Sequence, residues 1–169
     1  DGFAQWRSGA AQPTRLVLVG RGPLEADLRA QAARLGITDA VVFAGFREDI
    51  PTVMAAFDLF ALTSDYEGFG LVLLEAMAAR RAILATAVSA IPEIVEDGRT
   101  GLLVPRGDGA AVAQAIARLS HPGQRRAAGA AGRARLESAF TPRRMAEATL
   151  QVYRRALQKA PVADLAHVA

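Results

Sequence analysis

Two rhythms of apolar and polar positions alternate along this chain. Short apolar runs rich in Val, Leu, Ile and Phe are typical of buried strands, whereas segments with apolar residues at every third or fourth position are typical of helices. The expected strands are Arg15–Gly20, Val41–Gly45, Leu59–Thr63, Ala82–Thr86 and Gly101–Val104. Strands that alternate with helices predict a parallel sheet covered on both faces. We therefore expect a doubly wound α/β domain.

Glycines and prolines delimit the helical segments. Gly36 ends the first of them, and Pro122 and Pro142 stand where the first helical turn tolerates a missing N–H group. Thr141 is placed to cap the last helix. The expected helices are Leu24–Leu35, Pro51–Phe57, Leu71–Ala79, Gly109–Leu119, Pro122–Ala139 and Pro142–Lys159. We expect one domain over residues 1–160, with C-terminal helices over about 122–159, and a flexible tail over 161–169.

Length and composition narrow the class of protein. The 169 residues are enough for one domain with a real core, since a chain of this size buries roughly 70% of its unfolded surface. With 51% hydrophobic and 22% charged residues the composition is that of a soluble globular protein. No apolar run approaches the ~18 residues that span a membrane, and the start of the chain does not read as a signal peptide.

The charge pattern argues against a nucleic-acid partner. The formal charge of +3 comes almost wholly from arginine, because Lys159 is the only lysine. These arginines are scattered through Ala-rich helices with few aromatic residues beside them, which is a weak footprint for nucleic acid.

The chain has no cysteine, which excludes disulfides and zinc thiolate sites and fits a reducing compartment. His121 and His167 stand alone, so we expect no metal and no cofactor.

One run stands out as a candidate binding site. From Glu67 to Ala78 a glycine-containing loop, Gly68-Phe69-Gly70, precedes an apolar helix. A helix that begins near Gly70 directs its free N–H groups and positive dipole end at the loop, which favours a bound anion. Carboxylates accept hydrogen bonds from paired hydroxyls, so Glu67 and Glu75 suit a ribose or a neutral sugar. The same residues also fit a plain turn with two solvated glutamates.

This run resembles the signature of a known enzyme family. The E-x7-E spacing, with Gly-Phe-Gly inside and Glu-Ala-Met-Ala at its end, is similar to that of the retaining, nucleotide-sugar-dependent glycosyltransferases of GT-B fold, family four. The similarity extends in the same order over the segments Leu16–Pro23, Val42–Phe46, Ile91–Gly98 and Thr100–Pro105. It covers about Gly2 to Leu157. The resemblance implies a Rossmann-like, donor-binding C-terminal half of a GT-B fold.

The resemblance also implies roles for individual residues. Glu75 would hold the ribose hydroxyls, and the backbone N–H groups of Gly70 and Leu71 would hold the phosphate. Glu67, Phe69 and Gly70 would contact the donor sugar. In the family, the glutamate at the position of Glu67 supports a transfer that keeps the anomeric configuration. Glu67 is therefore the expected catalytic residue, as a group that positions the sugar and stabilises the transition state rather than as a nucleophile.

A second group of residues is expected along the nucleobase. The segment Gly45–Glu48 follows a strand at its carboxyl end, where open α/β sheets bind ligands, so Phe46 and Arg47 would lie near the base. Gly20 and Arg21 follow a strand in the same way and could contact base or phosphate. An ordinary strand-to-helix loop at Gly45–Glu48 stays open as an alternative.

The chain departs from the family pattern in three places. Arg80 stands where the family usually has a glycine after the helix, and a left-handed conformation there costs about 1 kcal/mol. Ala82 replaces a common proline, and Ser89-Ala90 replaces a common pair of glycines, so the loop near the sugar is expected to be reshaped. Ile91-Pro92-Glu93 is expected to pack a short helix against the sheet.

The family's first strand, with its Gly-Arg pair, and the lysine that follows have no counterpart in this sequence. Asp1 falls late in the helix after that strand, with Phe3 and Trp6 as its last buried positions. In the strand order 3-2-1-4-5-6 the first strand is central, so the sheet is expected to lack its middle. Either another chain supplies a strand, or Arg15–Gly20 and Leu59–Thr63 pair directly. Self-association is one consequence of the first alternative.

The function that these observations favour is sugar transfer from a nucleoside-diphosphate sugar to a glycan, a lipid or another acceptor. The implied partners are the nucleotide sugar and an acceptor-binding N-terminal α/β domain outside this chain, with a cytoplasmic location and peripheral contact at the inner membrane face. The alternative is a non-catalytic nucleotide- or sugar-binding module, or a subunit that needs a second chain. A nucleotide-sugar epimerase of related fold is less favoured, because E-x7-E with Gly-Phe-Gly points to transfer.

Overall fold

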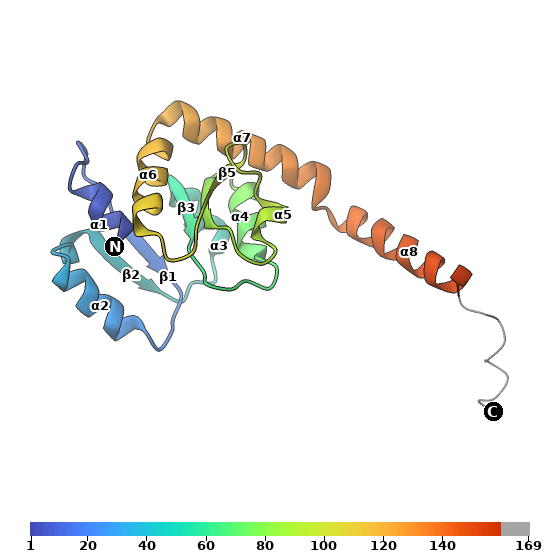
Figure 1. The fold of residues 1–169 in the computed structure, drawn as a ribbon, viewed down its shortest axis with the longest axis horizontal. Coiled ribbons are helices and arrows are strands. Elements are labelled where there is room, and N and C mark those ends of the chain that lie inside the picture. Colours follow the sequence, from blue (N-terminus) through green and yellow to red (C-terminus); the bar gives the residue numbers. More distant parts are fainter. Residues whose placement is uncertain (160–169) are drawn as a thin grey trace.

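The computed structural model in Figure 1 describes residues 1–159 and contains strands that alternate with helices. The strands are β1 (Leu16–Val19), β2 (Val41–Gly45), β3 (Leu59–Leu62), β4 (Ala82–Thr86) and β5 (Gly101–Val104). The helices are α1 (Gly2–Arg7), α2 (Glu25–Arg34), α3 (Ile50–Ala56), α4 (Leu71–Ala78), α5 (Ile91–Ile94), α6 (Gly109–Leu119), α7 (Pro122–Ala139) and α8 (Pro142–Lys159), with a 3-10 turn η1 (Thr38–Ala40). Every strand and helix predicted with bounds is present within one residue of them. The tail expected over 161–169 lies outside the described residues.

Strand β4 is the centre of the molecule. It pairs in parallel with β3 on one side and β5 on the other, and all five of its residues are buried. Successive side chains of a strand point to opposite faces. Ile83 and Ala85 accordingly pack with helices α3, α4 and α5, whereas Ala82 and Leu84 pack with α6 and α7. A strand covered on both faces explains its continuous apolar sequence and confirms the doubly wound α/β prediction.

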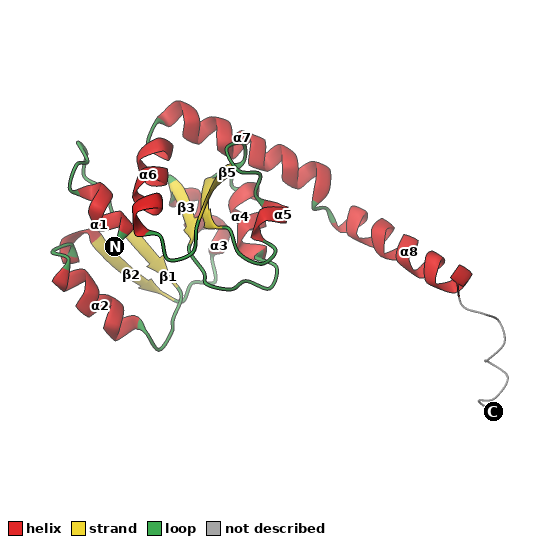
Figure 2. Cartoon of the chain, in the orientation of Figure 1, coloured by secondary structure: helices red, strands yellow, loops and turns green. Residues whose placement is uncertain are grey.

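The layers of this arrangement are visible in Figure 2, where the yellow strands are flanked by red helices. Helix α4 supplies Leu73, Ala76 and Met77 to one layer, and α6 supplies Ala115 and Leu119 to the other. The close packing of α7 requires a glycine, because a Cβ at Gly129 would lie 2.1 Å from the carbonyl oxygen of Arg80. Helix α7 is therefore held firmly against the turn that follows α4.

The sheet is divided. Strand β1 pairs in parallel with β2, and β3 pairs with β4, but within residues 1–159 β1 and β3 do not pair with each other. The expectation that these two strands could close up directly is therefore wrong. Helix α1 packs on α6 at backbone distance, since a Cβ at Gly2 would lie 2.6 Å from the carbonyl oxygen of Gly109 in α6. This contact joins the β1–β2 part of the chain to the part that contains β3, β4 and β5.

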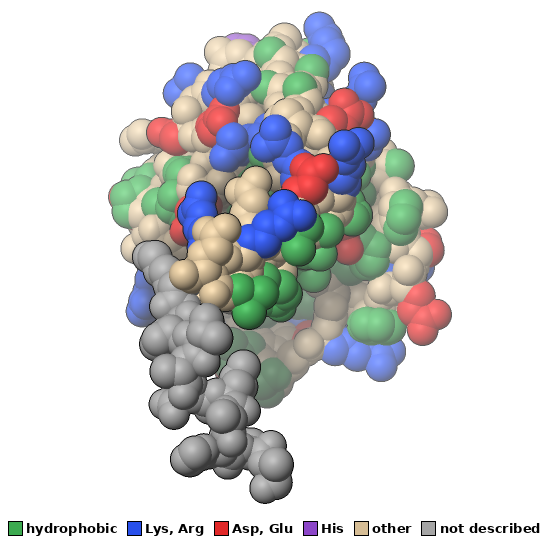
Figure 3. Space-filling model, turned by 90° about the vertical axis from the view of Figure 1, so that its right-hand side faces the viewer, with side chains coloured by type: hydrophobic (Ala, Val, Ile, Leu, Met, Phe, Trp, Pro, Cys, Tyr) green, Lys and Arg blue, Asp and Glu red, His purple; other side chains and the backbone are tan. Residues whose placement is uncertain are grey.

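Helix α8 extends away from the rest of the molecule (Figure 1). The side chains of residues 142–158 are all exposed, including those of Met145, Val152 and Leu157. Figure 3 views the molecule from the side of α8 and shows hydrophobic side chains exposed next to arginines. Thr141 caps this helix as predicted, since its Oγ1 accepts a hydrogen bond from the Arg144 N–H at 3.2 Å. Among the described residues, no helix is both long and apolar enough to cross a membrane.

Candidate functional site

The loop between β3 and α4, residues 63–70, is the centre of the candidate site. It leaves the carboxyl end of β3, next to the carboxyl end of β4, because the two strands are parallel. The buried Thr86, at the end of β4, donates from Oγ1 to the carbonyl oxygen of Ser64 at 2.6 Å. Arg106, in the loop after β5, pairs with Asp65 at 3.1 Å. The first half of this loop is thus in contact with the carboxyl end of β4 and with the loop after β5.

Gly70 lets the loop turn sharply into α4. Its φ of 87° lies in the left-handed region that favours glycine, and a Cβ there would lie 3.0 Å from Leu73 Cδ1 and 3.3 Å from Glu67 Cγ. No side chain caps α4 at Gly70, so the first N–H groups of the helix, at Leu71 and Val72, are available to a ligand. The predicted start of the helix near Gly70 is confirmed, and an uncapped helix N-terminus attracts anions.

The two glutamates lie on either side of this helix N-terminus. Glu67 is half-buried, and its backbone N–H donates to Ser89 Oγ at 3.4 Å. Glu75 is exposed and lies four residues after Leu71, which is exposed as well. Leu71 and Glu75 therefore occupy the same solvent-facing side of α4. The buried residues of the helix, Leu73 among them, face the core on the other side. A helix that begins at Leu71 thus settles the side on which Glu75 lies.

Phe69 is partly held by an aromatic neighbour from the end of α7. Its ring packs edge-to-face on Phe140, with 6.4 Å between the ring centroids and 69° between the planes. The side chain of Phe69 is still 45% exposed. Edge-to-face pairs are a favoured geometry for aromatic rings, so this contact orients the Gly-Phe-Gly turn.

The second predicted group, Gly20, Arg21, Phe46 and Arg47, lies at the carboxyl ends of β1 and β2. The Gly20 N–H donates to the carbonyl oxygen of Gly45 at 2.8 Å, which joins the two strand ends. Phe46 is exposed. Within residues 1–159, no hydrogen bond or ion pair joins this group to the loop 63–70. Each group is thus assembled on its own sheet.

Arg47 has an acidic partner in its own loop. Its guanidinium donates to both carboxylate oxygens of Asp49, at 2.8 Å and 2.6 Å. These hydrogen bonds lower the pKa of Asp49 below its usual value and raise the pKa of Arg47. A ligand that recruits Arg47 therefore has to compete with Asp49.

Three residues that support the site were not predicted as such: Thr86, Ser89 and Phe140. The sequence marked Ser89 only as a departure from glycine, and nothing local marks the other two, because their contacts come from distant parts of the chain.

Residues 1–159 contain no cluster of His, Asp and Glu side chains that could hold a metal ion. The expectation that no metal or cofactor takes part stays a prediction.

Comparison with known proteins assigns this arrangement to a family. The family model described as Glycosyl transferases group 1 matches residues 3–121, which include the whole loop 63–70 and α4. The chain belongs to the glycosyl transferases group 1 family. Among its curated relatives is N-acetyl-alpha-D-glucosaminyl L-malate synthase of Bacillus anthracis, 43% identical over 103 residues, which are 60% of this chain and 27% of that protein.

Solved structures share the fold, among them that of a glycosyl transferase group 1 family protein. The C-terminal domain of a glycosyl transferase group 1 family protein (LpcC) from Francisella tularensis superposes with a TM-score of 0.74 at 27% identity, covering 83% of this chain and 78% of that domain. Anabaena Alr3699/HepE in complex with UDP and glucose superposes with a TM-score of 0.78 at 28% identity, covering 89% of this chain. The chain spans 44% of that protein and is thus similar to one half of it.

Proposed function

We propose that this chain is the donor-binding domain of a retaining glycosyltransferase that moves a sugar from a nucleoside-diphosphate sugar to a glycan, lipid or other acceptor. The observation that carries the proposal is the uncapped N-terminus of α4 behind Gly70, flanked by Glu67 and Glu75. The crystal structure of the Anabaena relative, in complex with UDP and glucose, supports this ligand class.

The roles divide along α4. The N–H groups of Gly70 and Leu71 bind the phosphate, because the helix dipole and the unpaired donors favour an anion there. The carboxylate of Glu75, one turn further along the same exposed side, accepts the ribose hydroxyls. Glu67, Phe69 and Gly70 contact the donor sugar, and the half-buried Glu67 stabilises the transition state of transfer.

The base lies along the group at the ends of β1 and β2. Phe46 offers an exposed aromatic face, and Arg21 and Arg47 offer guanidinium groups. Arg21 lies close to Gly45, since a Cβ at Gly45 would lie 4.0 Å from Arg21 Nε. Bases stack on aromatic and guanidinium planes alike, so this edge suits a nucleobase without fixing which one.

The partner of the whole enzyme is an acceptor-binding N-terminal α/β domain, and transfer takes place between the two domains without a metal ion. We place the enzyme in the cytoplasm, with peripheral contact at the inner membrane face where a lipid acceptor is used. By itself the chain binds nucleotide without transferring sugar. A chain that binds nucleotide but restores no transfer beside such a domain would support the non-catalytic alternative.

Titration of the chain with UDP, GDP and ADP tests the nucleotide site. We expect dissociation constants from high micromolar to millimolar, roughly −4 to −6 kcal/mol, because the chain corresponds to only 44% of the Anabaena protein solved in complex with UDP. Glu75→Ala should weaken binding by about 1.5–3 kcal/mol, since a charged acceptor is lost in the ground state.

Glu67→Ala should leave nucleotide binding unchanged and abolish transfer in the complete enzyme, because Glu67 acts in the transition state.

Glu147→Ala is the matched control for Glu75→Ala, since Glu147 is an exposed helical glutamate on α8. It should leave the affinity for all three nucleotides as it is in the wild type. Equal losses for the Glu67 and Glu75 variants would contradict the division of roles. A submicromolar constant for the wild-type chain would contradict the expected shortage of contacts.

A further inference from the structure

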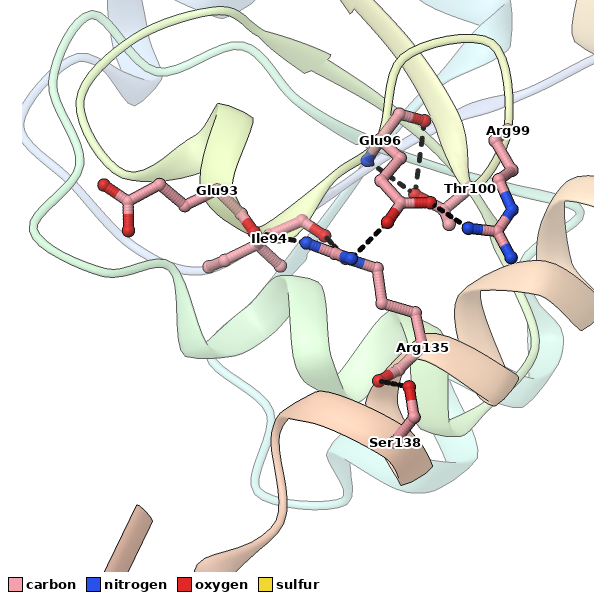
Figure 4. Close-up of polar contacts among 7 residues, drawn as sticks. All are labelled: Glu93, Ile94, Glu96, Arg99, Thr100, Arg135 and Ser138. Carbon is pink, nitrogen blue, oxygen red and sulfur yellow. Dashed lines mark hydrogen bonds and ion pairs between the residues drawn. The ribbon is translucent and has the colours of Figure 1, made fainter. Parts of the chain in front are cut away.

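Arg135 of α7 connects two segments that lie beside the candidate site. Its Nε donates to the carbonyl oxygen of Ile94 at 2.7 Å, and its Nη2 donates to that of Glu93 at 2.7 Å. Its Nη1 binds the Glu96 carboxylate, and the side chain is only 23% exposed. Figure 4 shows the guanidinium of Arg135 directed at these groups from the helix below. One guanidinium therefore binds three groups at, or just after, the carboxyl end of α5.

The segment that Arg135 binds has further hydrogen bonds and buried residues of its own. Arg99 binds the other oxygen of Glu96 at 2.6 Å, and the Glu96 N–H donates to Oγ1 of the fully buried Thr100 at 2.9 Å (Figure 4). Ile91 and Ile94 of α5 are fully buried in the core. A hold on the end of α5 is thus a hold on the segment that precedes it, Ser89-Ala90.

Two routes lead from Arg135 to the loop 63–70. The first runs through α5 to Ser89, whose Oγ accepts the hydrogen bond from the Glu67 N–H. The second runs through Phe140, since the Arg135 guanidinium lies 5.5 Å from the centre of that ring and the ring packs on Phe69. The routes reach the loop on either side of Gly68.

We propose that Arg135 is a positioning residue for the donor sugar: it sets the positions of Glu67 and Phe69 through α5 and Phe140. The inference rests on the proposed function, in which these two residues contact the sugar. Among residues 1–159, no hydrogen bond or ion pair joins Arg135 to either of them, so it acts through its neighbours. A lysine replaces it only in part, because a single ammonium group does not match three acceptors and a ring in fixed directions.

Backbone amide NMR spectra of the ligand-free chain test the proposal without any nucleotide. Arg135→Gln should shift the signals of residues 67–70 and of 89–90, and Arg135→Lys should restore them only in part. Phe140→Leu should shift Phe69 and Gly70 but leave 89–90 in place, because it breaks the second route alone. Arg133→Gln is the matched control: Arg133 also lies on α7 and donates to a helix-end carbonyl, that of Ala78, but has neither route.

Titration with UDP and with UDP-glucose supplies the functional readout. Arg135→Gln should lower the ratio of UDP-glucose to UDP affinity by roughly three- to tenfold, whereas the UDP affinity should change by less than about twofold. The control variant should change neither. If neither the wild type nor any variant binds UDP or UDP-glucose, the proposed function fails. The NMR spectra still decide whether Arg135 positions residues 67–70.

The proposal is overturned if folded Arg135→Gln leaves residues 67–70 unshifted, or if Arg133→Gln shifts them equally. It is also overturned if both ligands lose affinity by the same factor, because that result indicates an effect on the fold or on the shared nucleotide contacts and none on the sugar. If Arg135→Gln does not fold, the same signals are measured in Arg135→Lys and Phe140→Leu. Unshifted signals of Phe69 and Gly70 in both of these variants would reject the proposal.

Discussion

Within residues 1–159, two residues with side chains, Arg80 and Ser89, have positive φ angles of 55° and 49°. Arg80 follows α4 and closes it, since its N–H donates to the Met77 carbonyl and the next N–H donates to that of Ala76. Ser89 instead brings its hydroxyl to the Glu67 N–H. The strain at Ser89 therefore accompanies a contact with the candidate site, whereas the strain at Arg80 only ends a helix.

Arg80→Gly should stabilise the chain. Relief of the left-handed strain contributes about 1–2 kcal/mol, and the greater freedom of glycine in the unfolded chain offsets about 0.4–1 kcal/mol of it. We expect the free energy of unfolding in urea to rise by about 0.5–1 kcal/mol. Arg80→Ala is the control, since it removes the long side chain and keeps the Cβ that causes the strain. A glycine variant no more stable than the alanine variant would show that Arg80 is not strained.

At the scale of single residues, local signals were sufficient for some predictions and not for others. The left-handed turn at Arg80 and the cap at Thr141 were predictable, because each depends on its immediate neighbours in the chain. The hydrogen bond of Ser89 to Glu67 spans 22 positions, and no residue near Ser89 announces it. The assigned ligand contacts of Glu67 and Glu75 stay predictions.

Among the elements, arginines repeatedly close the carboxyl ends of helices. Arg81 donates to the Phe57 carbonyl after α3 at 2.7 Å, and Arg133 donates to the Ala78 carbonyl of α4 at 3.0 Å. Arg135 does the same for α5. The last carbonyls of a helix lack partners within it and carry the negative end of its dipole, so cations bind there. The arginine-rich composition thus has a structural use.

Element bounds were predictable, whereas the relations between elements were only partly so. Apolar runs and caps fix where β4 or α6 begins and ends, because those signals lie within a few residues. The division between β1 and β3 was expected from the family's strand order, but their direct pairing had stayed open. The structure shows that they do not pair, and it also shows a close contact of Gly2 with α6 that the composition of α1 alone does not reveal.

Helix α8 should contribute little to the stability of this chain by itself. Its side chains over 142–158 are exposed, and most helical stability in proteins comes from packing of an apolar face. A chain that ends after Thr141 should therefore melt within about 2 °C of the full chain, less than the shift expected for 1 kcal/mol. Hydrogen exchange should show much faster exchange in α8 than in α7. A large drop in Tm on truncation would indicate that α8 packs on the body in solution.

The whole molecule consists of two unequally buried halves. Strands β3, β4 and β5 hold the core between α4 and α6, whereas no residue of β1 or β2 is fully buried. Leu28, Val42 and Phe46 in the first half are more than a third exposed. Because burial of apolar surface supplies most of the stability, the β1–β2 half should be the less stable part.

This division makes a prediction for the isolated chain in solution. Within residues 1–159, the edges of β1 and β3 that face away from their partners have unpaired backbone groups, and such edges invite pairing with another chain. Light scattering should show a mass that rises with concentration, and amides of β1 and β2 should exchange before those of β4 and β5.

Ala61→Lys places a charge at an exposed position of β3 and should reduce the association. Ala117→Lys adds the same charge on α6, away from any strand edge, and should not. A monomer at every concentration, with β1 as protected as β4, would show that the divided sheet is stable without a partner.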